Sequence, residues 1–311
     1  MSEILKLSPS FKDYIWGGNK LMAQYGVKDM DRVAEAWVLS AHPDGPSYLP
    51  DGTTFVDALA KMGPDAVGKN AAAFKDFPQL IKLIDAQSDL SVQVHPSDEY
   101  ALANEGQFGK TEMWYILDAE EGAGIYYGFQ KDVTRAEMEE AIRTNTLTDI
   151  LRFVPVQPGE SYFIPSGTIH AIGKGLLIAE IQQNSNVTYR VYDYGRKDAQ
   201  GNTRPLHVEK ALEVSDLTRV AEPEEPARTE VDGVVVTNVA KCPYFSVAKL
   251  EVDSSVALVN SDSFQAVLIT AGSGTIDGEP FNQYDTFFVP ADYGQVVLRG
   301  QFEALVSCIQ E

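Results

Sequence analysis

The sequence has few cysteines, few histidines, a shortage of basic residues and no long hydrophobic run. Its two cysteines, Cys242 and Cys308, cannot form a disulfide framework and have no metal-ligand spacing, so we interpret them as small buried side chains. The segment from Met1 to Tyr14 lacks a signal-peptide core, and no stretch reaches the roughly 18 apolar residues that a membrane span needs. These absences predict a soluble, cytoplasmic protein.

Positive charge is scarce, because 25 Lys and Arg residues stand against 45 Asp and Glu residues and give a formal net charge of −20. A surface this acidic repels phosphate backbones and anionic lipids, which argues against nucleic acid and membranes as partners. Any anionic small molecule must therefore be held by a few well-placed cations. With 44% hydrophobic residues, the 311-residue chain is otherwise typical of a globular protein of two domains or one large all-β body.

The hydrophobic pattern predicts a mainly β protein with a few short helices. Helical spacing or capping residues indicate helices over residues 55–62, 97–104, 134–145 and 205–217, the third beginning with a capping box of Thr134 and Glu137. Short runs rich in β-branched and aromatic residues predict strands. These runs cover residues 80–85, 90–95, 112–117, 124–129, 161–164, 169–172, 176–181, 187–192, 234–239, 245–250, 256–259, 264–269, 274–276, 286–289, 295–298 and 304–308.

The clearest linker is the segment 221–226, which contains two prolines and three glutamates and therefore packs poorly. It divides the mixed N-terminal part of the chain from a C-terminal part in which strands alternate with Gly and Asp. We expect a catalytic domain with helical insertions over residues 1–218, a linker over 219–226 and a smaller β domain over 227–311.

Two of the four histidines lie in informative surroundings. His95 ends a predicted strand two residues after Gln93, so both side chains share one face, although alone such a histidine more often bonds to backbone than to metal. His170 closes the run 159–170, in which Gly, five residues, Pro, one residue, Gly, two residues and His follow one another. This spacing resembles the second signature motif of the cupin superfamily, whose turns aim a histidine into a small β-barrel. The Asn that often follows is replaced by Lys174.

Further motifs resemble the type I mannose-6-phosphate isomerases. Residues 91–96 (SVQVHP) and 109–115 (GKTEMWY) are similar to one half of the family's metal site, and His170 with residues 180–185 (EIQQNS) through Arg190 to the other half. The N-terminal Trp16-Gly17-Gly18 and Glu35-Ala36-Trp37 also fit. The resemblance spans roughly residues 16–196 and is to the short bacterial form, which lacks the extra helical domain of longer members.

The resemblance implies two cupin-like β-barrels (jelly rolls) with a few helices, and one zinc ion per chain held by Gln93, His95, Glu112 and His170. Two neutral imidazoles, one carboxylate and one amide leave zinc an open position for water or substrate. A neutral amide is a poor ligand, so Gln93 either binds weakly or only orients the others. An amide also suits redox-inert zinc better than the iron of a cupin dioxygenase.

The resemblance further implies catalytic roles for Arg190, Lys110 and Glu180, and substrate contacts for Ser91, Lys110 and Arg190. Outside the motifs, each cation is better explained as a surface partner of an acid, and Glu180 is equally well explained as a buried partner of a cation. Lys110 and Glu180 stay alternative proton carriers. An acid common in the family four residues before the arginine is Asn186 here, so no carboxylate acts from that position.

A second turn-and-strand segment lies near the C-terminus, where residues 284–290 parallel residues 159–165. Five residues past Pro290 comes Gln295, at the place that His170 occupies after Pro165, and the glycines of the first motif are replaced. This pattern predicts a second cupin-like barrel without metal ligands.

The implied activity is a zinc-dependent aldose–ketose isomerisation that interconverts mannose 6-phosphate and fructose 6-phosphate through an enediol intermediate. Two alternatives stay open at this point. One is an isomerase of an unphosphorylated sugar, and the other is a metal-binding cupin that senses sugar phosphates without catalysis. The oligomeric state is also open.

Overall fold

The computed structural model describes residues 3–197, 200–223, 225–259 and 262–310. The chain forms two compact units: unit 1 comprises Met1–Ser10, Trp37–Ile81 and Glu224–Glu311, and unit 2 comprises Phe11–Ala36 and Lys82–Pro223. The predicted continuous domains 1–218 and 227–311 stay a prediction, and Glu224 of the predicted linker lies outside the described residues. No helix among the described residues is long and apolar enough to cross a membrane.

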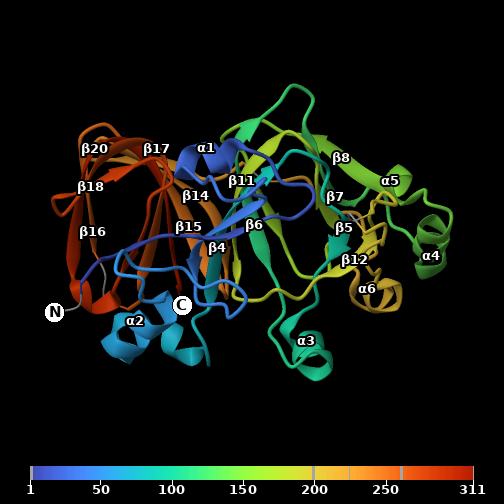
Figure 1. Cartoon of the computed structure of the whole chain (residues 1–311), viewed down its shortest axis with the longest axis horizontal. Helices are drawn as coiled ribbons and strands as arrows, with labels where there is room; N and C mark the ends of the chain where they lie inside the picture. The colour runs from blue at the N-terminus through green and yellow to red at the C-terminus, as the bar shows by residue number, and fades with distance from the viewer. Residues whose placement is uncertain (1–2, 198–199, 224, 260–261, 311) are drawn as a thin grey trace. The chain divides into compact units, whose positions relative to one another are not determined.

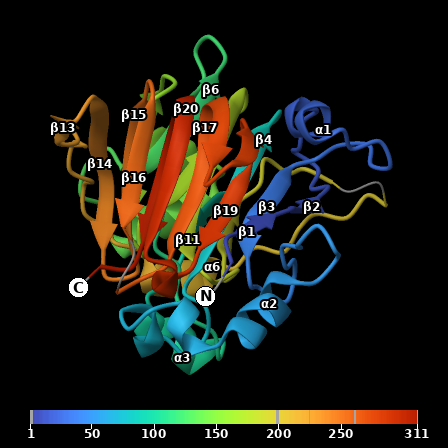
Figure 2. The same cartoon turned by 90° about the vertical axis from the view of Figure 1, so that its left-hand side faces the viewer.

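Unit 1 contains a nine-stranded antiparallel sheet with the order β1-β19-β17-β20-β15-β14-β13, in which β16 also pairs with β20 and β18 with β17 (Figure 2). Its strands are β1 (Leu5–Leu7), β13 (Arg228–Val231), β14 (Val234–Cys242), β15 (Phe245–Val252), β16 (Ser255–Val259), β17 (Gln265–Ile276), β18 (Glu279–Asn282), β19 (Thr286–Val289) and β20 (Gln295–Cys308). The predicted helix over residues 55–62 is α2 (Phe55–Met62), and three 3-10 turns, Pro64–Ala66, Ala71–Ala73 and Ala291–Tyr293, complete this unit.

Unit 1 corrects two predicted boundaries. Strands expected at 264–269 and 274–276 are one strand, β17, and those expected at 295–298 and 304–308 are one strand, β20. The glycines inside these runs predict turns, but in the structure they lie within the strands and allow the paired strands to approach closely. Gly300 has a φ of +140° and lies opposite Gly274, and a Cβ on it would come within 2.4 Å of the Ser273 carbonyl oxygen.

Unit 2 is built on two antiparallel sheets. The five-stranded sheet has the order β12-β5-β10-β7-β8, and the six-stranded sheet has the order β2-β3-β4-β11-β6-β9. The chain passes from one unit to the other within strands β2, β3 and β4. The first sheet comprises β5 (Val92–Val94), β7 (Gly124–Phe129), β8 (Leu151–Pro155), β10 (His170–Ile172) and β12 (Tyr189–Tyr192). The second comprises β2 (Ser10–Lys12), β3 (Glu35–Ser40), β4 (Gln79–Ala86), β6 (Glu112–Ala119), β9 (Ser161–Ile164) and β11 (Leu176–Gln183).

The two sheets share one hydrophobic core. Trp114 and Ile178 of the six-stranded sheet belong to the same buried cluster as Ile125 and Ile172 of the five-stranded sheet. Because side chains alternate along a strand, residues on the inner face of each strand point toward this core and their neighbours point away. The sheets therefore enclose a common interior.

Helices cover the outer face of the five-stranded sheet (Figure 1). Met138 of α4 and Leu212 of α6 pack in one cluster with Val92, Val94 and Val191. Because side chains alternate along a strand, the residues next to these valines point to the inner face of the sheet. The helices of this unit are α1 (Lys20–Tyr25), α3 (Asp98–Asn104), α4 (Arg135–Arg143), α5 (Leu147–Ile150) and α6 (Val208–Val214). The capping box at Thr134 is confirmed, α6 is shorter than predicted, and α1 and α5 were not predicted.

Candidate active site

The strands of unit 2 bring the predicted ligands together from separate parts of the chain. Gln93 lies in the middle of β5, and both His170 of β10 and Arg190 of β12 are registered opposite it. Glu112 is the first residue of β6, and His95 directly follows β5. Helix α3 lies in the long gap between His95 and Glu112, as predicted.

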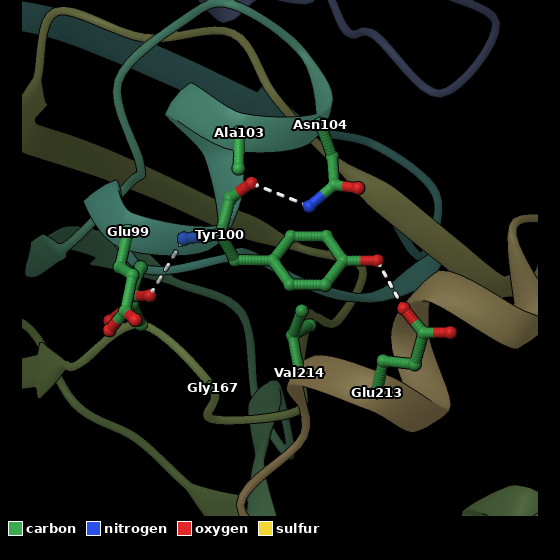
Figure 3. A pocket seen from close by; sticks show the side chains of 9 residues that line it. Glu99, Tyr100, Ala103, Asn104, Gly167, Glu213 and Val214 are labelled. Carbon is green, nitrogen blue, oxygen red and sulfur yellow. Dashed lines mark hydrogen bonds between the residues drawn. The ribbon is translucent and has the colours of Figure 1, made fainter.

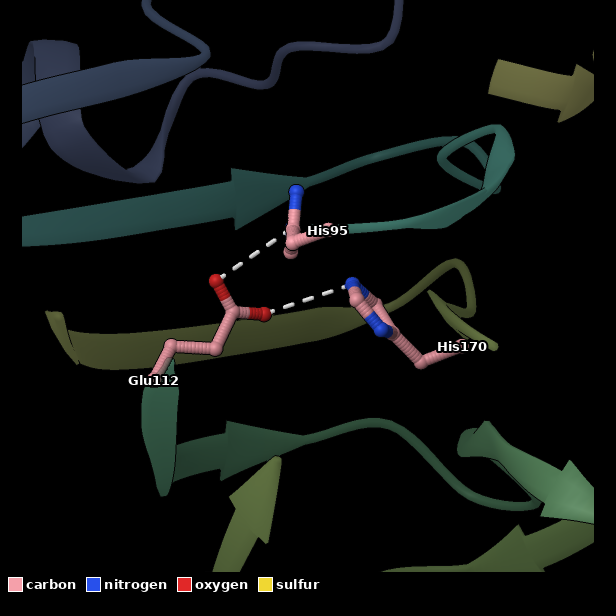
Figure 4. Close-up of side chains that lie close together, drawn as sticks. All are labelled: His95, Glu112 and His170. Carbon is pink, nitrogen blue, oxygen red and sulfur yellow. Dashed lines mark ion pairs between the residues drawn. The ribbon is translucent and has the colours of Figure 1, made fainter. Parts of the chain in front are cut away.

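His95, Glu112 and His170 form one buried group (Figure 4). Glu112 Oε2 lies 3.5 Å from His95 Nε2, and Glu112 Oε1 lies 3.3 Å from His170 Nε2. One ligand atom from each of the three residues falls within 4.8 Å of the others. Gln93 is close to this group, because its Nε2 lies 3.4 Å from His170 Nε2. This geometry is that of a compact set of ligands around one point.

Both imidazoles are held in the orientation that a metal ligand needs. His95 Nδ1 lies 2.8 Å from the Val187 carbonyl oxygen, and His170 Nδ1 lies 2.8 Å from the Thr168 carbonyl oxygen. A carbonyl only accepts, so each Nδ1 carries the proton and each Nε2 presents its lone pair to the group. Burial, followed by the positive charge of Lys110, lowers the pKa of His95 well below its usual range, and burial lowers the pKa of His170 to about 4.

The Glu112 carboxylate is the third donor. It is fully buried, its Oε2 lies 2.5 Å from Lys110 Nζ, and its Oε1 accepts no hydrogen bond from the described residues. Burial and the charge of Glu180 raise the pKa of Glu112. A buried carboxylate with one oxygen free of hydrogen bonds, beside two neutral imidazole nitrogens, is a donor set that fits a divalent cation such as zinc.

Lys110 also belongs to a chain of buried ion pairs. Glu180 Oε1 lies 3.5 Å from Lys110 Nζ and 3.3 Å from Lys82 Nζ, while Lys82 also faces Glu35 at 3.8 Å. Trp114 Nε1 donates a hydrogen bond of 3.0 Å to the second oxygen of Glu180. Burial alone would raise the pKa of Glu180, but the charges of Lys110 and Lys82 hold it below its usual range. Burial alone would lower the pKa of Lys82, but the charges of Glu35 and Glu180 raise it. Glu180 and Lys82 therefore stay ionised near neutral pH.

A cavity of about 270 Å³ opens beside these groups. Gln93 and Lys110, which contact the histidine–glutamate group, form part of its wall. Its lining contains four cationic side chains and two carboxylates, a positive excess in a chain whose net charge is −20. The charged lining residues are Glu35, Lys82, Lys110, Glu180, Arg190 and Arg204.

A second cavity of unit 2, about 450 Å³ in volume, lies between α3 and α6 (Figure 3). Tyr100 donates a hydrogen bond to Glu213 across it, and its only charged lining residues, Glu99 and Glu213, are acidic. It offers no cation among the described residues of its wall, so it fits an anionic ligand less well than the smaller cavity does.

The predicted site residues all lie in or beside the smaller cavity. Ser91 and Arg190 line it together, and Arg190 Nε donates a hydrogen bond of 3.2 Å to Ser91 Oγ. Sequence analysis noted Glu35 only as part of a motif and did not identify Lys82 or Arg204. A lysine in the apolar run 80–84 was the one available signal, because such a residue is rarely buried without a charged partner.

Two parts of the chain match models of known protein families. Residues 4–125 match the family model "Phosphomannose isomerase type I, catalytic domain", and residues 235–309 match "Mannose-6-phosphate isomerase, cupin domain". The mainly β fold, its cupin domain and the buried histidine–glutamate group together define a cupin-class protein with a candidate metal site.

The mannose-6-phosphate isomerase ManA of Bacillus subtilis is 39% identical over 98% of this chain and 99% of its own length. A crystal structure of the mannose 6-phosphate isomerase from Bacillus subtilis has a TM-score of 0.90 and 34% identity, covering 98% of this chain and 99% of that one. A mannose 6-phosphate isomerase solved with zinc and yttrium shares the fold, with a TM-score of 0.77 at 17% identity over the full length of both chains. The chain belongs to the type I mannose-6-phosphate isomerase family.

Proposed function

We propose that this protein interconverts mannose 6-phosphate and fructose 6-phosphate. The observation that carries the proposal is the buried group of His95, Glu112 and His170 beside a small cavity with an excess of positive charge. Relatives named for this activity match almost the whole chain, which supports the same conclusion. A sugar phosphate is anionic, so the positive lining also supplies the cations that an acidic protein needs to bind it.

We assign one zinc ion per chain to Gln93, His95, Glu112 and His170. The two Nε2 lone pairs and the buried carboxylate, whose Oε1 accepts no hydrogen bond from the described residues, support this assignment, as does the zinc-bound structure of a protein with the same fold. When bound, the ion acts as a Lewis acid that stabilises negative charge on a substrate oxygen. Gln93, at 3.4 Å from His170, either completes the ligand set or orients that histidine.

The residues that line the cavity have different roles in the isomerisation. Aldose–ketose isomerisation moves a proton between carbons 1 and 2 through an enediol, and the developing oxyanion requires fixed positive charge. Lys82, held between Glu35 and Glu180, keeps its charge and supplies part of it. Lys110 and Glu180 are the two candidate proton carriers, since both line the cavity and contact each other. Arg190 adds a planar cation suited to an enediolate or a phosphate.

A coupled isomerase assay tests the proposal. The purified protein should convert mannose 6-phosphate, lose this activity after chelation and regain it with zinc, while elemental analysis finds one zinc ion per chain. Preference for free mannose over its 6-phosphate would indicate an isomerase of unphosphorylated sugars. Binding of sugar phosphate without turnover in the zinc-loaded protein would indicate a sensor.

Arg190→Ala separates metal binding from catalysis in the same assay. Arg190 contacts Ser91 and the Pro205 carbonyl but none of the ligands in the histidine–glutamate group among the described residues. The variant should therefore retain its zinc and lose isomerisation. Retained turnover would remove Arg190 from the catalytic set.

We also propose that the protein acts in the cytoplasm. Cys242 and Cys308 are free thiols, as is usual in a reducing compartment. Fractionation of the producing cells, with isomerase activity as the marker, tests this location.

A further inference from the structure

Three arginines lie around one buried carboxylate near the cavity. Arg204 donates to Asp193 through Nε at 2.8 Å and Nη2 at 2.6 Å, and Arg196 donates to the same carboxylate through Nε at 3.1 Å. Asp193 is 6% exposed, and its single negative charge is shared between both guanidinium groups. The carboxylate therefore fixes the plane of Arg204 but neutralises only one of its two arginine partners.

Arg190 adds a third positive charge. Its side chain contacts Ser91 Oγ and the Pro205 carbonyl oxygen, and no carboxylate within the described ranges forms an ion pair with it. Burial, followed by the charge of Arg204, lowers the pKa of Arg190, which means that the two guanidinium groups repel each other. Repulsion between partly buried cations costs free energy that a bound anion would relieve.

The cavity contains these cations in a definite order of burial. Lys82, Lys110 and Glu180 are buried, whereas Arg190 and Arg204 are partly exposed. A hexose 6-phosphate carries its phosphate at the end of the molecule opposite to carbons 1 and 2, where isomerisation occurs. With carbons 1 and 2 beside the buried lysines, the phosphate falls among the outer, partly exposed residues of the cavity.

We propose that Arg204, positioned by Asp193, binds the phosphate of the substrate together with Arg190 and so selects phosphorylated over free sugars. This inference rests on the proposed isomerase function and assigns a specificity role to a residue outside the predicted site. Bidentate contact between a fixed guanidinium and a phosphate is strong and directional, whereas a neutral hydroxyl at carbon 6 gains little from it. Arg196 contributes by sharing Asp193, and it does not line the cavity.

The test compares Arg204→Gln with Arg219→Gln in the full-length, zinc-loaded protein. Both variants remove one positive charge, but the Arg219 side chain is 57% exposed, pairs with Glu222 and lies outside the lining of the cavity. For Arg204→Gln we expect KM for mannose 6-phosphate to rise about 10-fold or more with a much smaller change in kcat, because a charge-assisted hydrogen bond is lost. The inhibition constant of inorganic phosphate should rise by a similar factor. Arg219→Gln should change neither value.

Several results would overturn the inference. These are an unchanged KM and phosphate inhibition in Arg204→Gln, a loss confined to kcat, or equal effects of both variants, which would indicate only the overall charge. If Arg204→Gln does not fold, Arg204→Lys keeps the charge but not the bidentate fork, and it should raise KM by a smaller factor than complete removal. An inactive wild-type protein would contradict the proposed function, and calorimetric titration of wild type and variant with inorganic phosphate would still test the role of Arg204.

Discussion

The segment that leads to His170 in unit 2 and the segment that leads to Gln295 in unit 1 have the same backbone plan. Gly159 has a φ of +94° two residues before β9, and Tyr284 has a φ of +68° two residues before β19. Each four-residue strand ends just before a proline, and each next strand begins five residues later, at His170 or Gln295. The turn is therefore kept even where glycine is replaced by a bulky residue that rarely adopts this conformation.

The two segments differ in the surroundings of the residue at which the second strand begins, His170 or Gln295. His170 is 1% exposed and faces a carboxylate, whereas Gln295 is exposed and lines, with Phe287, a cavity of about 1040 Å³. Of the described residues that follow Glu225, no Asp, Glu, Lys, Arg or His is buried, while unit 2 buries many. The comparison teaches that this β framework holds equally well with or without a charged interior, so the chemistry depends on a few substitutions.

The largest effect is expected from His170→Gln, which places the residue of the C-terminal segment in the candidate metal site. The change removes an imidazole donor and leaves Glu112 buried with one histidine. Zinc affinity and turnover should each fall by more than the 10- to 100-fold typical of losing a supporting contact. Elemental analysis and the coupled assay measure both quantities.

The reciprocal change, Gln295→His, serves as the control. A single exposed histidine does not make a site, so the zinc content should stay at the wild-type value. A second zinc ion per chain in this variant would show that the C-terminal segment is closer to a metal site than its side chains indicate.

The next largest effect concerns two lysines that each lie between two carboxylates, Lys82 in unit 2 and Lys249 in unit 1. Lys82 is 5% exposed and pairs with Glu35 and Glu180, whereas the partners of Lys249, Glu251 and Glu303, are 32% and 40% exposed. Lys82→Met should lower the free energy of unfolding by about 3 kcal/mol, because it removes the positive charge from between two buried carboxylates. Lys249→Met should cost below about 1 kcal/mol, because water screens that pair.

Urea denaturation followed by circular dichroism measures both lysine variants. Equal losses would mean that the interior around Lys82 is as well screened as the surface around Lys249. The electrostatic contrast between the two parts of the chain would then have to be abandoned.

Much of the candidate site could be predicted from the sequence because its signals are local. The spacing of Gly159, Pro165 and His170 resembles a known motif whose turns aim a histidine inward, and alternation along β5 places Gln93 and His95 on one face. The same alternation is confirmed by the packing of Val92 and Val94 against the helices. Local rules were sufficient wherever one strand or one turn determines the direction of a side chain.

The rest depends on contacts between distant segments. Strand β4 is buried at all eight positions, so alternation does not distinguish Lys82 from its apolar neighbours. Arg204 lines the cavity and donates two hydrogen bonds to Asp193, and no pattern around residue 204 indicates that pairing. The lengths of β17 and β20 were also missed, since glycines that allow close strand pairing have the same sequence pattern as turns.

A smaller effect is expected from Tyr284→Gly, which gives the C-terminal turn the residue of the catalytic one. Glycine relieves a positive φ that costs tyrosine about 1–2 kcal/mol, but it also removes a ring that is 8% exposed. Loss of a buried aromatic side chain costs about 3–5 kcal/mol, so the net loss of stability should be about 2 kcal/mol. A variant more stable than wild type would show that strain at this turn outweighs the packing of the ring.

The smallest effect is expected from Gly159→Ala, which tests the same conformation without a large side chain. A Cβ at Gly159 would meet only Tyr115 Oη, at 4.0 Å, so crowding contributes little and the cost comes from the positive φ alone. The free energy of unfolding should fall by about 1 kcal/mol, and zinc content should not change. Because this turn leads directly into β9 and on to His170, a loss of zinc in the variant would show instead that the turn positions the metal ligand. The two turns would then differ in function although they share one backbone conformation.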